Sequence, residues 1–459
     1  MRNQRLLLVL FLCLVSSPSF ATSFVLNNVL LPDFATRELN PVNVEIADGD
    51  IKRIVDIDVN LSHADVRDGQ GKVIMPAFID MHSHSMGNSS LDRSDYQYIG
   101  VRGTANAMMY AGVHGWLDLY SNEEDIFGYR DEQFPGERNE AFVFAAGPCF
   151  TVPTGHCDFG ETRLISTPEE AIHELRDLNN ARPNVAKIVY DNAGRRPTVD
   201  RATLEAFLSE AKRLGIKSVV HVGSWDDIRT ATELGADAVT HLPMDAMPDD
   251  IPQLMAAQGT AFIPTTGVVA ELMLLHQPSD SELAASVLAI PMTEKLVKDD
   301  LLQDYPVVAG NERHQSTFDW LAGLKTEGVF SIRHDAMSQL DQAGVEILVG
   351  SDGGNFAVFQ GVGFHREMYF LQQLGMSPWD IVMGATHNAY DFLGLEWGLE
   401  EGRPAHFTLH DSRIFEDLSL STEFEHMYLH GREVSREPLL RYAKPGFFQY
   451  MKLFFGFEV

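Results

Sequence analysis

The sequence predicts an α/β fold, in which a barrel of alternating strands and helices carries a small β-domain. From residue 73 onward, short apolar runs typical of buried strands alternate with helical patterns, as expected when parallel strands are joined through helices. The chain has 459 residues, 45% of them hydrophobic. This length accommodates one barrel of about 200 to 400 residues and a further module.

The chain is expected to begin with a secretory signal over residues 1–21. Arg2 and Arg5 precede an apolar run at residues 6–15, and Ser19-Phe20-Ala21 matches a small-residue cleavage site. The run is too short for a membrane span, which needs about 20 residues, so a retained anchor is the less favoured alternative. We therefore expect export, to a periplasm or out of the cell, without stable membrane insertion.

Short strands are expected at both ends of the mature chain. Those after the signal cover residues 24–31, 42–47 and 51–59, and those near the C-terminus cover residues 405–409 and 425–429. They predict one small β-domain, formed by residues 22–72 and 396–435, beside a barrel at residues 73–395. An aromatic-rich tail follows at residues 436–459; it is expected to pack on the barrel or on a neighbouring subunit, which leaves a homo-oligomer open.

Helix start and stop signals divide the barrel. Thr167 is a candidate N-cap, followed by proline at the first helical position and a capping-box glutamate. Gly215 is placed to end the next helix, and Ser377 to begin a later one. The segment at residues 271–342 is long enough for either a lid over the barrel mouth or a plain helical insertion.

The sequence Asp80-Met81-His82-Ser83-His84 closes an apolar run at residues 73–79 that predicts one buried strand. Residues two apart in a strand point the same way, so the imidazoles of His82 and His84 leave one face together. Two neutral imidazoles that face one cavity are the start of a transition-metal site. Because a chain with 17 histidines can produce this spacing by chance, the pair needs partners.

Four further ionisable residues end or interrupt apolar strand-like runs, namely Lys187, His221, His241 and Asp352. Burying a charged group in such a place is costly unless the group is paired or chemically modified. For any one of these residues a satisfied structural role is the simpler interpretation. Five strand ends that offer ligands in sequence order favour a shared metal centre instead.

This pattern resembles the amidohydrolase superfamily, in its binuclear-metal branch with a carboxylated lysine (imidazolonepropionase/prolidase-like amidohydrolases). The resemblance covers residues 24–435 and implies a (β/α)8 TIM barrel, with a β-sandwich-like domain built from both chain ends. Ala77 departs from the glycine usual before the histidine pair, and the loop Thr154-Gly155-His156 has one glycine where related enzymes often have two. The ligand set that the resemblance implies is His82, His84, Lys187, His221, His241 and Asp352.

The resemblance further implies two divalent metal ions. One would be held by His82, His84 and Asp352 and the other by His221 and His241, with carboxylated Lys187 between them. Zinc is expected because imidazole-rich sites suit it, with manganese, iron and cobalt as alternatives. A hydroxide bridging the metals would be the nucleophile, and Asp352 the general acid and base.

Hydrolysis of an amide C–N bond is the favoured reaction. Deaminases of the superfamily usually lack the lysine and carry a glutamate shortly after the histidine that corresponds to His221, whereas Val222-Gly223-Ser224-Trp225 follows His221 here. The narrower prediction is a dipeptide or an N-acyl amino acid as the substrate. A lactonase or phosphotriesterase, a deaminase, and a non-catalytic metal-binding protein remain as alternatives.

Four residues are candidates for binding a small-molecule substrate. Arg195 and Arg196, in the loop after the apolar run that holds Lys187, could bind a carboxylate bidentately, although most exposed arginines are only solvated. Tyr190 and His156 are candidates to orient the substrate carbonyl.

The acidity and the cysteines limit the remaining possibilities. A formal net charge of −30 repels phosphates, which argues against nucleic-acid binding and is otherwise typical of a soluble surface. After the signal only Cys149 and Cys157 remain, and an exported chain could join them in a disulfide. Two unpaired thiols are the equally weighted alternative.

Overall fold

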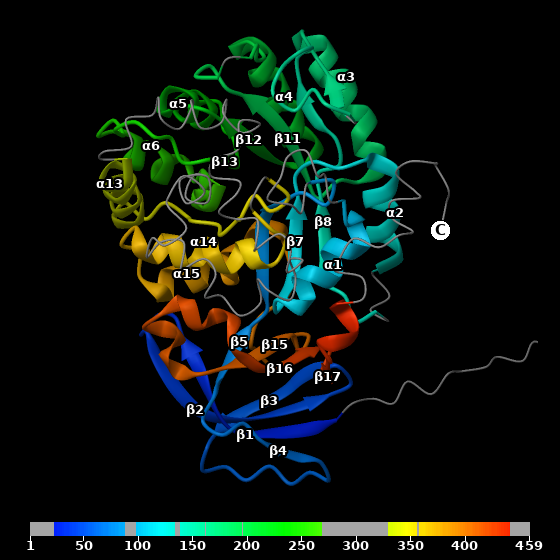
Figure 1. Ribbon diagram of the computed structural model, residues 1–459, viewed down its shortest axis with the longest axis vertical. Coiled ribbons are helices and arrows are strands. Elements are labelled where there is room, and N and C mark those ends of the chain that lie inside the picture. Colours follow the sequence, from blue (N-terminus) through cyan, green and yellow to red (C-terminus); the bar gives the residue numbers. More distant parts are fainter. Residues whose placement is uncertain are drawn as a thin grey trace, which may run out of the picture.

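In the computed structural model of the protein, the described residues are 23–87, 98–133, 138–160, 162–194, 196–268, 329–355 and 358–440. The predicted signal and Arg195 lie outside these residues, as do the tail beyond residue 440 and most of the predicted lid or insertion. The described chain has an α/β fold with several sheets (Figure 1). None of its described helices combines the length and the apolar character needed to cross a bilayer.

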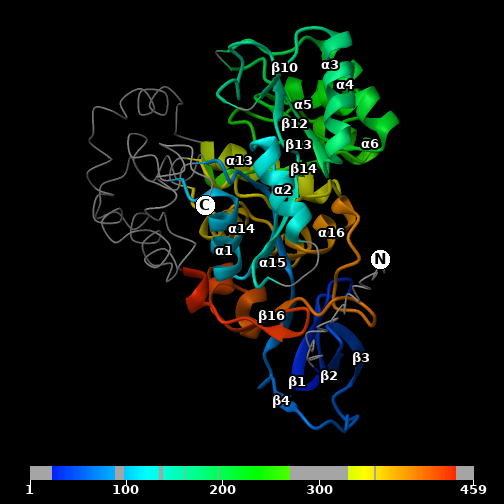
Figure 2. The ribbon, with the colours of Figure 1, turned by 90° about the vertical axis from the view of Figure 1, so that its right-hand side faces the viewer.

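Strands from the two ends of the chain share one mixed eight-stranded sheet, with the order β17-β16-β15-β5-β1-β2-β3 and β4 beside β1. Its strands are β1 (Phe24–Asp33), β2 (Glu38–Ala47), β3 (Asp50–Asp56), β4 (Val66–Asp68), β5 (Val73–Pro76), β15 (Phe407–His410), β16 (Phe424–Leu429) and β17 (Arg432–Glu433). Alternating apolar residues of β1, β2 and β15 form a separate small core. Figure 2 shows this sheet at one end of the molecule, away from β10 and β12–β14.

The apolar run at residues 73–79 is not one strand, so that prediction is wrong. β5 pairs with β15 antiparallel in the eight-stranded sheet. After Ala77, β6 (Phe78–Ser83) pairs with β7 parallel in another sheet. A continuous apolar run signals burial but does not say which sheet its residues enter, so the break could not be read from hydrophobicity.

Two parallel sheets carry all the candidate ligand residues except Asp352, in their strands or directly after them. The first has the order β6-β7-β8, and the second the order β10-β9-β11-β12-β13-β14. Their strands after β6 are β7 (Val113–Asp118), β8 (Phe142–Ala145), β9 (Cys149–Thr151), β10 (Thr162–Leu164), β11 (Val185–Tyr190), β12 (Lys217–Val222), β13 (Ala238–Thr240) and β14 (Ala261–Ile263). Their apolar residues belong to one large core cluster shared with the helices.

Backbone hydrogen bonds connect the two parallel sheets. Leu348 N donates to Phe262 O of β14 at 2.9 Å, and Met81 N of β6 donates to Val349 O at 2.8 Å. The segment that leads to Asp352 therefore lies between β14 and β6. On the other side, Asn184 N donates to Ala145 O at 2.9 Å, which joins the start of β11 to β8.

Helices follow most strands of the parallel sheets. They are α1 (Gly100–Tyr110), α2 (Glu123–Gln133), α3 (Pro168–Leu178), α4 (Arg201–Leu214), α5 (Trp225–Glu233), α6 (Ile251–Gln258), α13 (Val329–Gln342), α14 (Val362–Gln373), α15 (Pro378–Ala385) and α16 (His387–Leu393). Three predicted end signals are confirmed. Thr167 and Ser377 accept N-cap hydrogen bonds, and Gly215 ends α4 in the left-handed conformation.

Candidate metal centre

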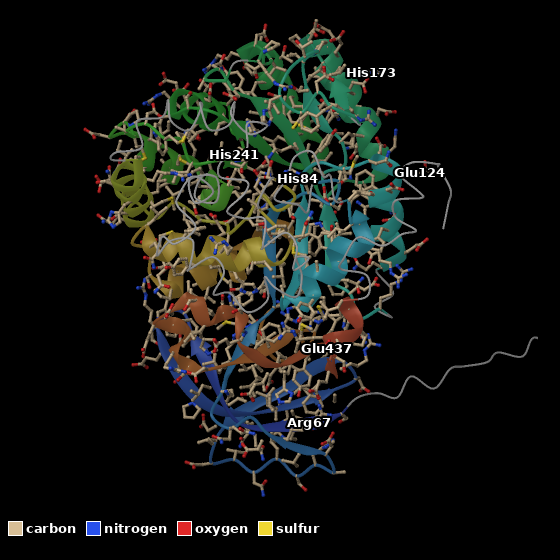
Figure 3. The ribbon with its side chains drawn as sticks, in the orientation of Figure 1. Arg67, His84, Glu124, His173, His241 and Glu437 are labelled. Atoms are coloured by element: carbon tan, nitrogen blue, oxygen red, sulfur yellow. The ribbon has the colours of Figure 1, made fainter. Side chains whose placement is uncertain are left out.

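Five of the six predicted ligand residues lie in strands of the parallel sheets or directly after them, and Asp352 lies in the segment between β14 and β6. His82 and His84 lie at the end of β6, Lys187 in β11, and His221 near the end of β12. His241 directly follows β13, and Asp352 follows the segment between β14 and β6. Figure 3 shows His84 and His241 inside the α/β part of the molecule.

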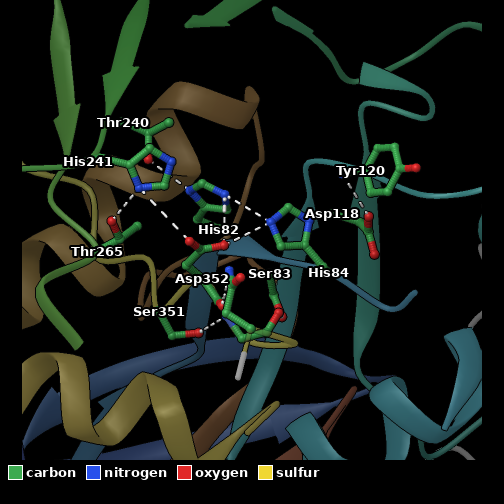
Figure 4. Close-up of polar contacts among 12 residues, drawn as sticks. His82, Ser83, His84, Asp118, Tyr120, Thr240, His241, Thr265, Ser351 and Asp352 are labelled. Carbon is green, nitrogen blue, oxygen red and sulfur yellow. Dashed lines mark hydrogen bonds and ion pairs between the residues drawn. The ribbon is translucent and has the colours of Figure 1, made fainter. Parts of the chain in front are cut away.

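His82, His84 and Asp352 direct their ligand atoms toward one another (Figure 4). Asp352 Oδ1 lies 2.8 Å from His84 Nε2 and 3.3 Å from His82 Nε2, and the two Nε2 atoms are 3.2 Å apart. His82, His241 and Asp352 each offer a ligand atom within 4.8 Å of the others. This spacing suits a shared cation.

Two threonines fix the orientation of the imidazoles. Thr265 donates its hydroxyl hydrogen to Pro264 O at 2.8 Å, so its oxygen accepts from His241 Nδ1, which lies 2.7 Å away. Thr240 Oγ1 lies 2.8 Å from His82 Nδ1, within hydrogen-bond distance. Since the Nδ1 atoms are engaged by hydroxyls, the Nε2 atoms are left for a metal.

His221 continues the cluster on the far side of His241. Its ring centroid lies 4.3 Å from that of His241 and 4.4 Å from that of His156, on which it stacks. Lys187 lies on the neighbouring strand β11, two residues before the residue that pairs with His221 of β12. Its charge adds to the effect of burial in lowering the pKa of His82. The structure therefore brings all six predicted residues to one place.

Lys187 is almost completely buried, with 2% of its surface exposed. Its Nζ has no hydrogen-bond partner among the described residues, and burial lowers its pKa from 10.5 to about 8. Keeping a buried lysine in its charged ammonium form costs free energy when no partner is present. The orphaned nitrogen therefore fits carboxylation, which would replace the ammonium by a carbamate that can bind cations.

The protonation states of the site also suit metal binding. Burial lowers the pKa of His82 and His221 well below the usual value and that of His241 to about 3. Burial alone would raise the pKa of Asp352, but the charge of His82 and the hydrogen bond from His84 outweigh it and hold this pKa low. The site thus offers neutral imidazoles at His82, His221 and His241 and a carboxylate at Asp352, the forms that coordinate metals. His84 differs, because its hydrogen bond with Asp352 outweighs burial and raises its pKa.

Sequence reasoning missed Asp80, which is fully buried behind the ligands. Its Oδ1 accepts from His82 N at 3.1 Å and Ser351 N at 2.9 Å, and its Oδ2 from Ser351 Oγ at 2.6 Å. Asp80 thereby ties the end of β6 to the segment that carries Asp352. The signal was present, because Asp80, His82 and His84 alternate onto one face of the strand.

A cavity of about 170 Å³ adjoins the His221 side of the centre. His156 and Arg196 line it, as does Asp191, which sequence reasoning did not select. Tyr190 does not line this cavity. It belongs to the large apolar core. Because it is three residues after Lys187 in the same strand, its side chain lies on the opposite face of β11 from that of Lys187.

Cys149 and Cys157 are free thiols in this structure. They lie together beside Tyr120 and Val189, and a hydrogen bond from Cys149 lowers the pKa of Cys157. The predicted alternative of two unpaired thiols describes this structure.

The comparisons with known proteins agree with the fold. The chain is similar to a Xaa-Pro dipeptidase with bound methionine in its active site (17% identity, TM-score 0.69, covering 90% of this chain and 100% of the other). It is also similar to a putative prolidase from Bifidobacterium longum, with 22% identity and a TM-score of 0.66 over 92% of this chain and 98% of the other. A molinate hydrolase has 17% identity and a TM-score of 0.69 over 91% of this chain and 96% of the other. No curated protein matches the sequence significantly.

A family model adds the sequence-level assignment. The model described as "Amidohydrolase family" matches residues 73–434, which include all six predicted ligand residues. This match spans most of the chain and both parallel sheets. The protein therefore belongs to the Amidohydrolase family.

Proposed function

We propose that the protein is a metal-dependent hydrolase that cleaves an amide C–N bond. The observation that supports this most is the convergence of four imidazoles and Asp352 near the orphaned, buried nitrogen of Lys187. A structural ion pair would not leave that nitrogen without a partner. Membership of the Amidohydrolase family is consistent with the proposal.

We further propose that the two parallel sheets form one closed (β/α)8 barrel. The hydrogen bonds between β14, the segment before Asp352 and β6 support closure on one side, and those between β8 and β11 support it on the other. The sheet made from both chain ends would then be the small β-domain. Active sites of such barrels lie at the carboxyl ends of the strands, where the candidate ligands are found.

Two divalent cations, most consistent with zinc, would occupy the site. His82, His84 and Asp352 would hold one, His221 and His241 the other, and carboxylated Lys187 would connect them. When bound, the cations would supply an activated water at neutral pH and polarise the substrate carbonyl. Neutral imidazoles with carboxylate-type oxygens are a donor set that suits zinc.

Asp352 is the group placed to move protons. It is buried, with 5% of its surface exposed. Its two oxygens face different parts of the cluster, because Oδ1 lies 2.8 Å from His84 Nε2 and Oδ2 lies 3.9 Å from His241 Nδ1. Such a carboxylate can accept a proton from the attacking water and deliver it to the leaving amine. Two of the similar structures, a dipeptidase and a putative prolidase, favour a peptide-like substrate.

Metal analysis and a substrate panel test this proposal. The panel contains dipeptides, N-acyl amino acids, lactones, phosphotriesters and aminated heterocycles, so that the alternative reactions are included. We expect amide hydrolysis and about two metals per native chain, with loss of both in Lys187→Ala. The exposed Lys212→Ala is the matched control and should behave as the native protein does.

Two outcomes would contradict the proposal. Hydrolysis of lactones or phosphotriesters without amides would assign a different reaction to the same site. Full activity in Lys187→Ala would remove the lysine from the mechanism.

A further inference from the structure

Asp191 is a carboxylate at the edge of the metal centre that the metal assignment does not use. It follows β11 directly and is four residues after Lys187, so the two side chains lie on the same face of the strand. Its Oδ2 is 4.0 Å from His221 Nε2, and its side chain is 16% exposed. Asp191 also lines the cavity beside His156, so a molecule in that cavity would meet its charge.

The loop around Asp191 holds the carboxylate in one orientation. Oδ1 accepts from Ala193 N at 3.0 Å and from Gly194 N at 2.7 Å. A Cβ atom at Gly223 would lie 1.9 Å from this oxygen, so the glycine makes room for it. Because Oδ1 is committed to the loop, Oδ2 is the oxygen left for a ligand.

Among the described residues, no lysine or arginine pairs with Oδ2 and no hydrogen bond reaches it. Its nearest basic atom is His221 Nε2 at 4.0 Å, on an imidazole whose pKa burial lowers well below the usual value. Arg196 lines the same cavity but forms no ion pair with Asp191. Arg196 Nη1 instead donates a hydrogen bond to Gly155 O at 3.1 Å. The cavity thus offers a fixed negative charge near the metal centre and a separate positive charge.

We propose that Asp191 binds the free α-ammonium of an aminoacyl substrate, so that the enzyme prefers dipeptides to N-acyl amino acids. In an aminoacyl group the nitrogen is two bonds from the carbonyl carbon. An ammonium held at Oδ2 therefore places the scissile carbonyl beside His221 and the metals. This inference rests on the proposed amide hydrolysis and narrows its substrate class.

The test compares L-leucyl-L-alanine with its N-acetyl derivative, which differs in the charge of the α-nitrogen. The native protein should show the higher kcat/KM for the free dipeptide. Asp191→Asn keeps the acceptor for Ala193 and Gly194 and removes the charge, so kcat/KM for the free dipeptide should fall about 10- to 100-fold. Hydrolysis of the N-acetyl compound should change little.

Asp226→Asn, an exposed carboxylate at the start of α5, serves as the control and should leave both substrates unaffected. Metal content is measured in parallel and should remain at the native value in Asp191→Asn. Loss of metal, or an equal fall for both substrates, would make Asp191 a metal ligand and overturn the inference.

The two proposals fail separately. Equal hydrolysis of both compounds by the native protein would refute the role of Asp191 while leaving amide hydrolysis intact. If neither these compounds nor any other amide is cleaved, the proposed function fails and the inference with it.

Discussion

Asp80 shows how a residue that binds no substrate can determine the geometry of the centre. Its carboxylate accepts three hydrogen bonds from His82 and Ser351, and Asp352 N in turn donates to His82 O at 2.7 Å. Asp352 itself adopts a left-handed φ of 59°, which costs energy for any residue other than glycine. The hydrogen bonds that Asp80 accepts from His82 and Ser351 offset that energy and keep Asp352 facing His84.

We predict that Asp80→Ala lowers the free energy of unfolding by about 2–4 kcal/mol, because two buried N–H groups and a hydroxyl lose their acceptor. The same variant should bind less metal, since Asp352 is no longer held in place. Asp80→Asn keeps one acceptor and should retain most of both properties. Urea denaturation and metal analysis provide the measurements; equal stability of the alanine and asparagine variants would exclude the role of Asp80.

At this scale the sequence indicated the clustered candidate residues better than the side chains that support them. The six candidates stand out because ionisable residues are unusual at the ends of apolar runs. They are His82, His84, Lys187, His221, His241 and Asp352. Asp80 and Asp191 obey the same alternation and could have been selected. Thr240 and Thr265 could not, since a hydroxyl that orients an imidazole is no different in sequence from one that satisfies a turn.

At the scale of elements, Asp227 of α5 joins the loops after β11 and β12. Its carboxylate accepts from Asn192 Nδ2 at 2.7 Å, Asn192 N at 3.1 Å and the N-cap Ser224 Oγ at 2.8 Å. Only 1% of its surface is exposed. One side chain therefore fixes the loop that carries Asp191 relative to the strand that carries His221.

Asp227→Ala is expected to destabilise the protein by about 1–3 kcal/mol, because three partly buried hydrogen bonds to its carboxylate are lost. Its neighbour Asp226 is exposed, and Asp226→Ala should change stability by less than about 0.5 kcal/mol. Thermal and urea denaturation of the pair measure the difference. Similar losses in the two variants would contradict the assigned role.

Element ends were predictable where the chemistry is local. The N-cap of α3 and the terminal glycine of α4 follow from a few adjacent residues. The break at Ala77 was not predictable, because it depends on β15, more than 300 residues away, pairing with β5. Long-range pairing leaves no mark on the apolar pattern of the strand itself.

At the scale of the whole molecule, buried histidines join the parallel sheets and their helices to the C-terminal elements. His114 Nε2 of β7 lies 3.1 Å from Tyr428 O of β16. His365 of α14 contacts Ala111 O at 2.6 Å and Ser421 Oγ at 2.9 Å. Burial lowers the pKa of each imidazole from 6.5 to about 4, so both are neutral at pH 7.

This predicts a loss of stability in acid. Between pH 6.5 and 4 these histidines bind protons in the unfolded chain but not in the folded protein. The free energy of unfolding therefore decreases as the pH is lowered through that window. Each imidazole contributes about 1.4 kcal/mol per pH unit, or about 2 kcal/mol between pH 7 and 5.

Urea denaturation at pH 7 and pH 5 tests the effect in the double variant His114→Gln, His365→Gln. Its stability should fall by about 4 kcal/mol less than that of the native protein over this range. His173, whose side chain is 81% exposed and lies at the surface in Figure 3, gives the control variant His173→Gln. An unchanged pH dependence in the double variant would count against this interpretation.

The overall arrangement was predictable because strand-helix alternation and apolar runs are spread over most of the chain. The packing of His114 and His365 was not, because a buried histidine in a helix or strand carries no sequence signal of its partner.

The central claim is that two cations are held by six residues through a modified Lys187. Crystallography of metal-reconstituted protein, with anomalous diffraction at the metal edge, tests it directly. The account predicts two anomalous peaks, one beside His82, His84 and Asp352 and one beside His221 and His241, with carbamate density on Lys187 Nζ between them. A single peak with an unmodified lysine would contradict it.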